Sequence, residues 1–443
     1  MRALALTILT LALAVPVADA FQAPWTVESR RLDNGLTVAA ARLPTPGVVA
    51  VFVGVRVGSR DELDPGHTGF AHLFEHMMFR GTASMSEGEH RLRIQRLGLD
   101  TSAYTWDDQT VYYTVGPASA LGDIVALEAD RLRNLSYTED VFQTEARAVM
   151  GEHSRGLADP WTAMMEALLA TAFTVHSYGH PTMGVAEDIR RMPSRFDYSR
   201  EFRRRHYVPQ KTTLVLTGDV DLTVALALAE EHLGSWRGEG FDGAPPVEPP
   251  QTAPREVRVP WATPVAPRLL MGWRVPPFST GDSTSAAIEV ATELAFGRAS
   301  PTWRRLVVDE QVVEDLDLWS WPHRDAHLAI LAVRLRAPAA MDRVRQALQG
   351  ALDDIGAAEG GPWLAQEVPR ARDHLVSAAL LDVQAARDLG NRLIMLATVT
   401  GEPRSWLDHL ERLAAVEPGE VARAAARLSA SVRTTVVLTG GGP

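Results

Sequence analysis

The sequence predicts an α+β protein made of two homologous domains, each a mainly antiparallel sheet packed with helices. Three observations indicate this fold: the length of 443 residues, a proline-rich segment near the middle, and a strand sequence that occurs once in each half. Domains usually hold about 100–200 residues, so a chain of this length is expected to form two of them.

The proline-rich segment runs from Arg237 to Pro260 and contains the run Ala-Pro-Pro-Val-Glu-Pro-Pro. Proline cannot donate to a sheet and cannot continue a helix, so this segment is expected to be an extended linker. It would join an N-terminal domain at 21–236 to a homologous C-terminal domain at 261–443.

The repeated strand sequence is Thr-Thr-Leu-Val-Leu-Thr-Gly at 212–218 and Thr-Thr-Val-Val-Leu-Thr-Gly at 434–440. Short β-branched runs that end at a glycine are typical of buried strands. Because each copy lies near the end of its half, a duplicated domain is the better explanation than a chance match.

Other elements follow from residue type and spacing. β-branched and aromatic residues predict strands, and apolar residues three and four apart predict helices. The expected strands are 35–41, 48–57 and 110–115, and the expected helices are 118–135, 138–155 and 220–232. Ser136 to Glu139 has capping-box spacing ahead of the second helix. Strands that come in runs favour antiparallel sheets.

Composition and charge exclude several classes of function. The chain has no cysteine, which excludes thiol nucleophiles, iron–sulfur clusters and cysteine-based zinc sites. Any metal must therefore be bound by histidine and carboxylate. The formal net charge of −11 argues against a nucleic-acid partner.

The first twenty residues have the order of a secretory signal. Arg2 precedes an apolar run at 3–17, and Ala18-Asp19-Ala20 is a small-x-small cleavage site. We therefore expect a signal peptide at 1–20, cleavage near Ala20, and a secreted or periplasmic mature chain. No later segment is long and apolar enough to predict a membrane span in the mature chain.

The chemistry is concentrated in His72-Leu73-Phe74-Glu75-His76. In a helix, positions 72 and 76 are one turn apart, so both imidazoles can reach one ion. Glu75 lies at the edge of the same face, where it can reach a metal-bound water without being a ligand. The alternative is a structural histidine pair beside a surface glutamate, and the pentapeptide alone does not decide between the two.

A catalytic zinc needs a third protein ligand, and the helix expected at 138–155 offers Glu145 and Glu152. Seven residues are nearly two helical turns, so both carboxylates lie on one stripe about 10 Å apart along the axis. Neighbouring apolar residues suggest that this stripe faces inward, where a carboxylate is costly unless it is paired or metal-bound. Spacing alone does not decide which of the two is the ligand.

Four segments together resemble one known family. They are Gly69–Thr82, Ser102–Tyr113, Phe142–Pro160 and His176–Pro181. The first resembles the zinc-site signature of the pitrilysin/insulinase peptidases, in the short-chain branch of the mitochondrial processing peptidase β subunit and its bacterial relatives. The resemblance covers essentially the whole mature chain. It implies the LuxS/processing-peptidase-like metalloenzyme fold.

The resemblance also implies roles for individual residues. Glu152 becomes the third ligand of one Zn²⁺ per chain, and Glu145 becomes the carboxylate that orients the site. Glu75 becomes the base that activates water in a zinc-dependent endopeptidase acting on peptides or unfolded protein segments. The peptide substrate would bind as an added strand along a sheet edge, beside Ser102, Ala103 and Thr105.

Two departures from the family pattern affect these expectations. Relatives have asparagine where this chain has Ser102, which implies altered specificity. Relatives also contribute an arginine and, seven residues later, a tyrosine, where this chain has Val307 and Glu314. A paralogous subunit that supplies the Arg/Tyr pair is therefore expected as a partner. The alternative is that the chain is a non-catalytic assembly or binding subunit of a processing-peptidase-like complex.

Overall fold

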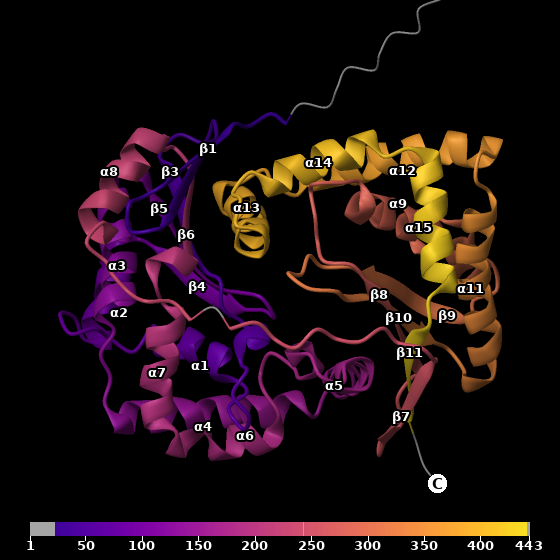
Figure 1. Cartoon of the computed structure of the whole chain (residues 1–443), viewed down its shortest axis with the longest axis horizontal. Coiled ribbons are helices and arrows are strands. Elements are labelled where there is room, and N and C mark those ends of the chain that lie inside the picture. The colour runs from indigo at the N-terminus through magenta and orange to yellow at the C-terminus, as the bar shows by residue number, and fades with distance from the viewer. Residues whose placement is uncertain (1–22, 242, 441–443) are drawn as a thin grey trace, which may run out of the picture.

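The computed structural model describes residues 23–241 and 243–440. The expected signal peptide at 1–20 and its cleavage site lie outside the described residues. Figure 1 shows two halves that face each other, each with one sheet and a set of helices. Of the helices in the described part of the chain, none has both the length and the apolarity needed to cross a membrane.

The first half contains a six-stranded sheet with the order β1-β2-β6-β3-β5-β4. Neighbouring strands are antiparallel except for β2 and β6, which are parallel. Its strands are β1 (Val27–Arg31), β2 (Thr37–Arg42), β3 (Val48–Val55), β4 (Asp100–Thr105), β5 (Thr110–Pro117) and β6 (Thr212–Gly218).

The second half contains a five-stranded sheet with the order β7-β11-β8-β10-β9, in which only β7 and β11 are parallel. Its strands are β7 (Arg255–Trp261), β8 (Arg268–Val275), β9 (Val313–Trp319), β10 (His327–Leu335) and β11 (Arg433–Gly440). β6 and β11 carry the repeated sequence and occupy equivalent positions, each parallel to one neighbour and antiparallel to the other. The expected α+β fold with two homologous halves is confirmed.

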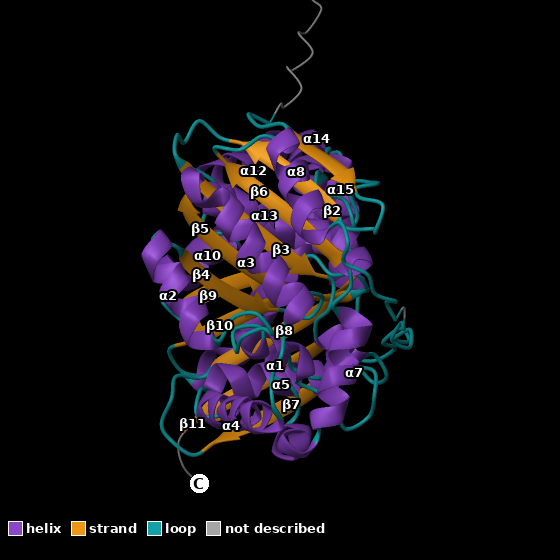
Figure 2. Ribbon diagram, turned by 90° about the vertical axis from the view of Figure 1, so that its left-hand side faces the viewer, coloured by secondary structure: helices purple, strands orange, loops and turns teal. Residues whose placement is uncertain are grey.

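The helices of the first half are α1 (Phe70–Met77), α2 (Glu87–Leu97), α3 (Leu121–Asn134), α4 (Glu139–Gly156), α5 (Pro160–Ala172), α6 (Ala186–Arg191), α7 (Phe196–His206) and α8 (Leu222–Leu233). Those of the second half are α9 (Thr284–Phe296), α10 (Pro301–Trp303), α11 (Met341–Ala357), α12 (Pro362–Leu381), α13 (Ala386–Thr400), α14 (Ser405–Ala415) and α15 (Pro418–Ala430). Figures 1 and 2 show α3 and α8 on the outer face of the first sheet.

Two local expectations differ from the structure. The side chain that caps α4 is Thr138, which accepts a hydrogen bond from the Val141 N–H, and not Ser136. β7 occupies the end of the segment expected to be linker. Its residues alternate between half-buried and exposed from Arg255 onward, so the strand pattern was present among the prolines. The domain boundaries themselves remain predictions.

Each half places one helix on the sheet of the other. α13 packs on β3 and β6 of the first sheet, and α5 packs on β7, β8 and β11 of the second. Gly390 of α13 allows the close approach, because a Cβ at this position would lie 2.3 Å from the Phe52 ring. Figure 1 shows both helices between the two sheets.

A buried polar seam also joins the halves. The Arg324 guanidinium pairs with Asp61 and Asp108 of the first half, and its side chain is only 10% exposed. In a second pair, the cation comes from the first half and the anion from the second, with Arg60 at 2.5 Å from Asp325. Charges buried this deeply are tolerated only when they are paired, so the seam specifies how the halves meet.

Candidate metal centre

Helix α1 carries the histidine pair on its open face. Leu73, Phe74 and Met77 lie on the opposite face and are fully buried in the core of the first half. His72 and His76 are one turn apart, and their ring centroids are 4.9 Å apart. Core packing therefore fixes the helix, and the helix presents both imidazoles to the same region.

The start of α1 is held by a residue outside the motif. Gly69 precedes the helix with φ of 89°, and a Cβ there would lie 2.6 Å from the Met183 carbonyl oxygen. Since glycine has no side chain to cap a helix, the buried Glu62 carboxylate does so, accepting from the N–H groups of Gly69 and Ala71 at 2.7 Å each. Burial raises the pKa of Glu62 to about 8, although these hydrogen bonds oppose the rise.

Helix α4 brings its acidic stripe against α1. Glu152 Oε2 lies 3.6 Å from His76 Nε2 and 3.9 Å from His72 Nε2. One donor atom from each of these three residues lies within 4.8 Å of the other two. The structure thus brings together the three side chains expected as ligands.

The chemistry of this trio fits zinc. Tetrahedral zinc with bonds of about 2.0–2.2 Å holds its donor atoms roughly 3.3–3.6 Å apart, close to the separations seen here. Burial and the neighbouring His76 lower the pKa of His72 to about 4, which keeps this ring neutral with a lone pair for a metal. The Glu152 side chain is 43% exposed, so one side of the site remains open to solvent.

Glu145 lies behind His76. Its Oε2 is 3.5 Å from His76 Nδ1, and its Oε1 is 3.0 Å from Arg80 Nε. The carboxylate raises the pKa of His76 and favours a proton on Nδ1, which leaves the Nε2 lone pair facing Glu152. Arg80 completes this chain of contacts and was missed by sequence reasoning, although it lies one turn beyond His76.

Glu75 is close to the trio without joining it. Thr105 Oγ1, at the end of β4, donates a hydrogen bond to Glu75 Oε2 over 2.8 Å. Burial raises the pKa of Glu75, and the Thr105 hydroxyl opposes the rise by favouring the ionised form. A carboxylate with this environment is suited to accept and return a proton.

The expected substrate strand is an edge strand. In the described part of the chain, β4 pairs only with β5, so its other edge presents unpaired backbone groups. Side chains alternate along a strand, so Ala103 lies on the same face as Thr105 and Ser102 lies on the opposite one. Ser102 is exposed, whereas the neighbouring Tyr104 donates to Asn391 of α13 over 2.7 Å.

Val307 and Glu314 stand where the family resemblance implies an arginine and a tyrosine, and both side chains make contacts within the second half. Val307 packs against the core of the second half, and Glu314 pairs with Arg334 over 2.8 Å. Neither residue offers the hydrogen-bond donor that a developing oxyanion requires.

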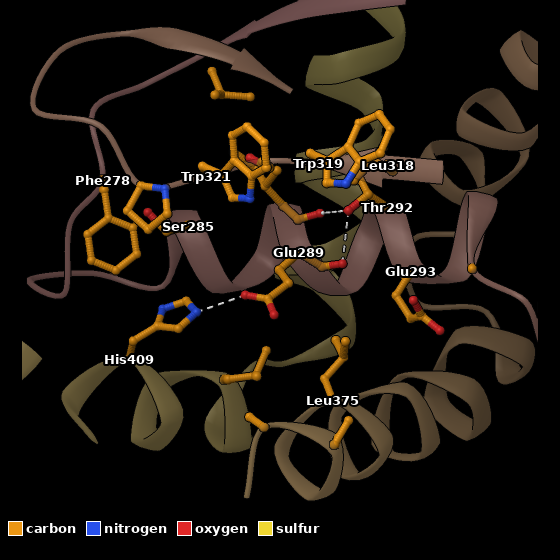
Figure 3. A pocket seen from close by; sticks show the side chains of 18 of the residues that line it. Phe278, Ser285, Glu289, Thr292, Glu293, Leu318, Trp319, Trp321, Leu375 and His409 are labelled. Carbon is orange, nitrogen blue, oxygen red and sulfur yellow. Dashed lines mark hydrogen bonds and ion pairs between the residues drawn. The ribbon is translucent and has the colours of Figure 1, made fainter. Parts of the chain in front are cut away.

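A separate cavity lies in the second half. Its volume is about 550 Å³, and Figure 3 shows side chains that line it from α9, the end of β9 and α14. A hydrogen-bonded pair, His409 and Glu289 at 2.8 Å, lies on its wall. None of the five expected zinc-site residues lines it, so this cavity is separate from the donor trio.

Comparisons with known proteins agree with this arrangement. Residues 37–186 match the family model described as Insulinase (Peptidase family M16), and residues 196–375 match Peptidase M16 inactive domain. An uncharacterized zinc protease of Mycobacterium leprae is 33% identical over 217 residues, covering 48% of each chain. A probable mitochondrial-processing peptidase subunit beta of Schizosaccharomyces pombe is 31% identical over 209 residues, covering 47% of this chain and 45% of the relative. The chain thus spans about half the length of the curated relatives it matches.

Solved structures extend the likeness of the fold to nearly the whole chain. A protease from Helicobacter pylori superposes with a TM-score of 0.85 at 21% identity, covering 94% of this chain and 99% of that one. A putative M16-like peptidase from Alicyclobacillus acidocaldarius gives a TM-score of 0.79, covering 95% and 100%. With the two family models matched in succession along both halves, the chain belongs to the insulinase family of peptidases, family M16.

Proposed function

We propose that this chain is a zinc-dependent endopeptidase that hydrolyses peptides or unfolded protein segments. His72, His76 and Glu152 would bind one zinc ion, and Glu75 would act as the general base. The observation that carries the proposal is the meeting of α1 and α4, which brings two imidazoles and a carboxylate together beside a second, half-buried carboxylate, that of Glu75.

A bound zinc ion would supply Lewis-acid polarisation of the scissile carbonyl and of water. Glu75 takes a proton from the attacking water while the water oxygen bonds to the carbonyl carbon. It delivers that proton to the amide nitrogen as the C–N bond breaks. Glu145 holds His76 in the tautomer that points Nε2 towards the site, and Arg80 holds Glu145.

The exposed edge of β4 would bind the substrate as an added strand. Backbone groups around Ser102 and Ala103 would pair with the peptide, which places it beside Thr105 and Glu75. Recognition through the backbone suits an extended, unfolded segment and leaves side-chain preference to other surfaces.

A partner subunit forms part of the proposal. Val307 and Glu314 leave the site without an arginine and a tyrosine, and relatives include a protein named as the β subunit of a processing peptidase. We propose that a paralogous chain supplies the missing pair.

We also propose that the mature chain is secreted or periplasmic. Residues 1–20 support export, because a basic residue, an apolar run and a small-x-small site follow one another in the order of a secretory signal.

A non-catalytic binding subunit is the second candidate, favoured by the same two residues. Zinc content and hydrolysis separate the two. The wild type should hold zinc and cleave internally quenched peptides, alone or mixed with a subunit that has the Arg/Tyr pair. Glu75→Gln should hold zinc without cleaving, and Glu152→Gln and His72→Ala should each hold one zinc ion fewer per chain than the wild type.

His67→Ala is the matched control, because His67 precedes α1 and its ring lies on Tyr198 with 4.0 Å between centroids. It should leave the zinc content unchanged. Zinc content unaffected by His72→Ala and Glu152→Gln would overturn the metal assignment. Zinc binding without hydrolysis, both by the chain alone and by its mixture with a subunit that has the Arg/Tyr pair, would favour the binding subunit.

A further inference from the structure

A second group of possible metal ligands lies where the two halves meet. Asp107 belongs to the loop between β4 and β5, whereas His323 lies between β9 and β10 and His327 begins β10. One donor atom from each of the three lies within 4.8 Å of the other two. None of these residues belongs to the site on α1 and α4.

Hydrogen bonds orient two of the three side chains, through the atoms that face away from the group. Asp107 Oδ1 accepts hydrogen bonds from Ser59 at 3.1 Å and Thr182 at 3.0 Å, which directs Oδ2 towards the histidines. His323 Nδ1 lies 2.8 Å from the Trp321 carbonyl oxygen, an acceptor, so Nδ1 carries a proton. Metal-binding histidines commonly have their second nitrogen held in this way.

The remaining nitrogen of His323 faces a carboxylate. Its Nε2 lies 3.0 Å from Asp107 Oδ2. If Nε2 carried a lone pair, it would repel the carboxylate oxygen at this distance. The contact therefore needs a positive species between the two atoms, which can be a second proton on the ring or a metal cation.

His327 distinguishes the proton from the cation. The residue is 5% exposed, and within the described residues neither ring nitrogen has a hydrogen-bond partner. Its Nε2 lies 3.7 Å from the same Asp107 oxygen. A proton on His323 would satisfy only the Asp107 contact and leave His327 unpaired, whereas one divalent cation would satisfy all three side chains.

We propose that Asp107, His323 and His327 form a second metal site, which takes zinc or another divalent transition metal and links the two halves. Two imidazoles and one carboxylate are a donor set that zinc accepts. The site goes beyond the proposed peptidase function and does not depend on it.

The surroundings allow the ligands to adjust. The rings of His323 and His327 are stacked with centroids 3.6 Å apart, so they must turn apart about their Cβ–Cγ bonds to share an ion. The unpartnered nitrogens of His327 leave its ring without a hydrogen bond to break. A cavity of about 170 Å³ is lined by all three ligands and can admit the ion and a fourth ligand.

The test is zinc content of the purified full chain, measured by mass spectrometry after chelation, reloading with Zn²⁺ and dialysis. A variant with both His72→Ala and His76→Ala should retain one zinc per chain. Adding His327→Phe should remove it, since phenylalanine keeps the ring contacts to Tyr178 and Phe173 without a metal donor. In the wild-type background, His327→Phe should reduce two zinc ions per chain to one.

His206→Phe is the matched control. His206 is also buried against Phe202, and among the described residues its Nδ1 has no hydrogen-bond partner and the residue belongs to no group of possible metal ligands. Its zinc content should equal that of its parent. Asp107→Asn gives a second variant if His327→Phe does not fold, and Zn²⁺ should raise the Tm of the double-alanine chain but not of either derivative. A double-alanine chain without zinc, or unchanged content in both His327→Phe and Asp107→Asn, would overturn the second site while leaving the first one standing.

Discussion

The hydroxyl of Thr105 donates to Oε2 of Glu75 over 2.8 Å and so joins the end of an edge strand to the zinc-motif helix. The two residues are 30 positions apart in the sequence. The residue that ends the expected substrate strand thus also contacts the expected general base. A movement of β4 when a peptide binds would therefore change the hydrogen bond to Glu75 directly.

Thr105→Val should move the acidic limb of the profile of kcat/KM against pH to higher pH. The hydroxyl favours ionised Glu75, so its loss raises the pKa of a base that must be ionised to act. A hydrogen bond to a charged group contributes about 1.5–3 kcal/mol, which corresponds to roughly ten-fold or more in kcat/KM on the acidic side.

Thr101→Val is the control for this change. Thr101 lies on the same strand and the same face, but its hydroxyl donates to the Tyr113 carbonyl at 3.2 Å. It should leave the acidic limb in place. If Thr105→Val does so too, the hydroxyl does not tune the base.

Glu145→Gln should weaken zinc binding by about 10–100-fold while preserving the fold. The amide has the shape of the carboxylate but lacks the charge that raises the pKa of His76. Competition with a chromogenic chelator measures the affinity. Glu87→Gln removes the other carboxylate next to Arg80, at 2.9 Å, and should leave zinc affinity unchanged. Equal affinities for both variants would contradict the role assigned to Glu145.

The sequence could predict those parts of the site that are local. His72, Glu75 and His76 lie about one helical turn apart. Glu145 and Glu152 lie nearly two turns apart. Helical periodicity alone therefore predicts that each set shares one face of its helix. The choice between the two glutamates could not come from spacing, because it depends on how α4 crosses α1. The family resemblance selected Glu152, and in the structure Glu152 is the one near both Nε2 atoms.

Contacts between segments far apart in the chain could not be predicted from the spacing of residues. Asp107 and His323 are 216 positions apart and meet only because the halves close on each other. The role of Glu62 follows from Gly69, whose missing side chain requires a cap from elsewhere, but nothing in the sequence says where that cap lies. The repeat at 212–218 and 434–440 was informative because it marks the same strand of the same topology twice.

Glu62→Gln should destabilise the chain by about 1–3 kcal/mol, since the amide NH₂ would face a backbone N–H of Gly69 or Ala71 and leave a buried donor unpaired. Unfolding in urea measures the change. An ordinary glutamate has a pKa of about 4.3, and burial raises that of Glu62 to about 8. The native state therefore holds a proton that the unfolded chain loses, which adds stability below pH 4.3 that is lost as the pH rises to about 8.

Because glutamine does not titrate, the advantage of the wild type over Glu62→Gln should narrow between pH 5 and pH 8. Glu187→Gln replaces an exposed acid in the first turn of α6 and should change stability by less than about 0.5 kcal/mol. A difference between wild type and Glu62→Gln that is flat over this range would show that Glu62 is ionised throughout.

Glu248→Gln tests how the central segment is anchored. Glu248 Oε1 accepts from the N–H and the hydroxyl of Thr174 at 2.8 Å each, and Oε2 accepts from the N–H groups of Val175 and His176 at 2.9 and 3.0 Å. Burial alone would raise the pKa of Glu248, but these hydrogen bonds lower it. An amide cannot accept on both sides, so the variant should lose about 1–2 kcal/mol at pH 7, as judged by urea unfolding.

The pH dependence of this loss has a defined sign. A carboxylate whose pKa is lowered in the native state contributes stability that is present above its unfolded pKa of about 4.3 and is lost as the pH falls through the native value. The difference between wild type and Glu248→Gln should therefore be full at pH 7 and disappear towards pH 3. Glu239→Gln, an exposed acid in the same segment, should show no such difference at either pH. If the Glu248→Gln deficit persists unchanged at pH 3, the anchoring does not depend on the charge of this carboxylate.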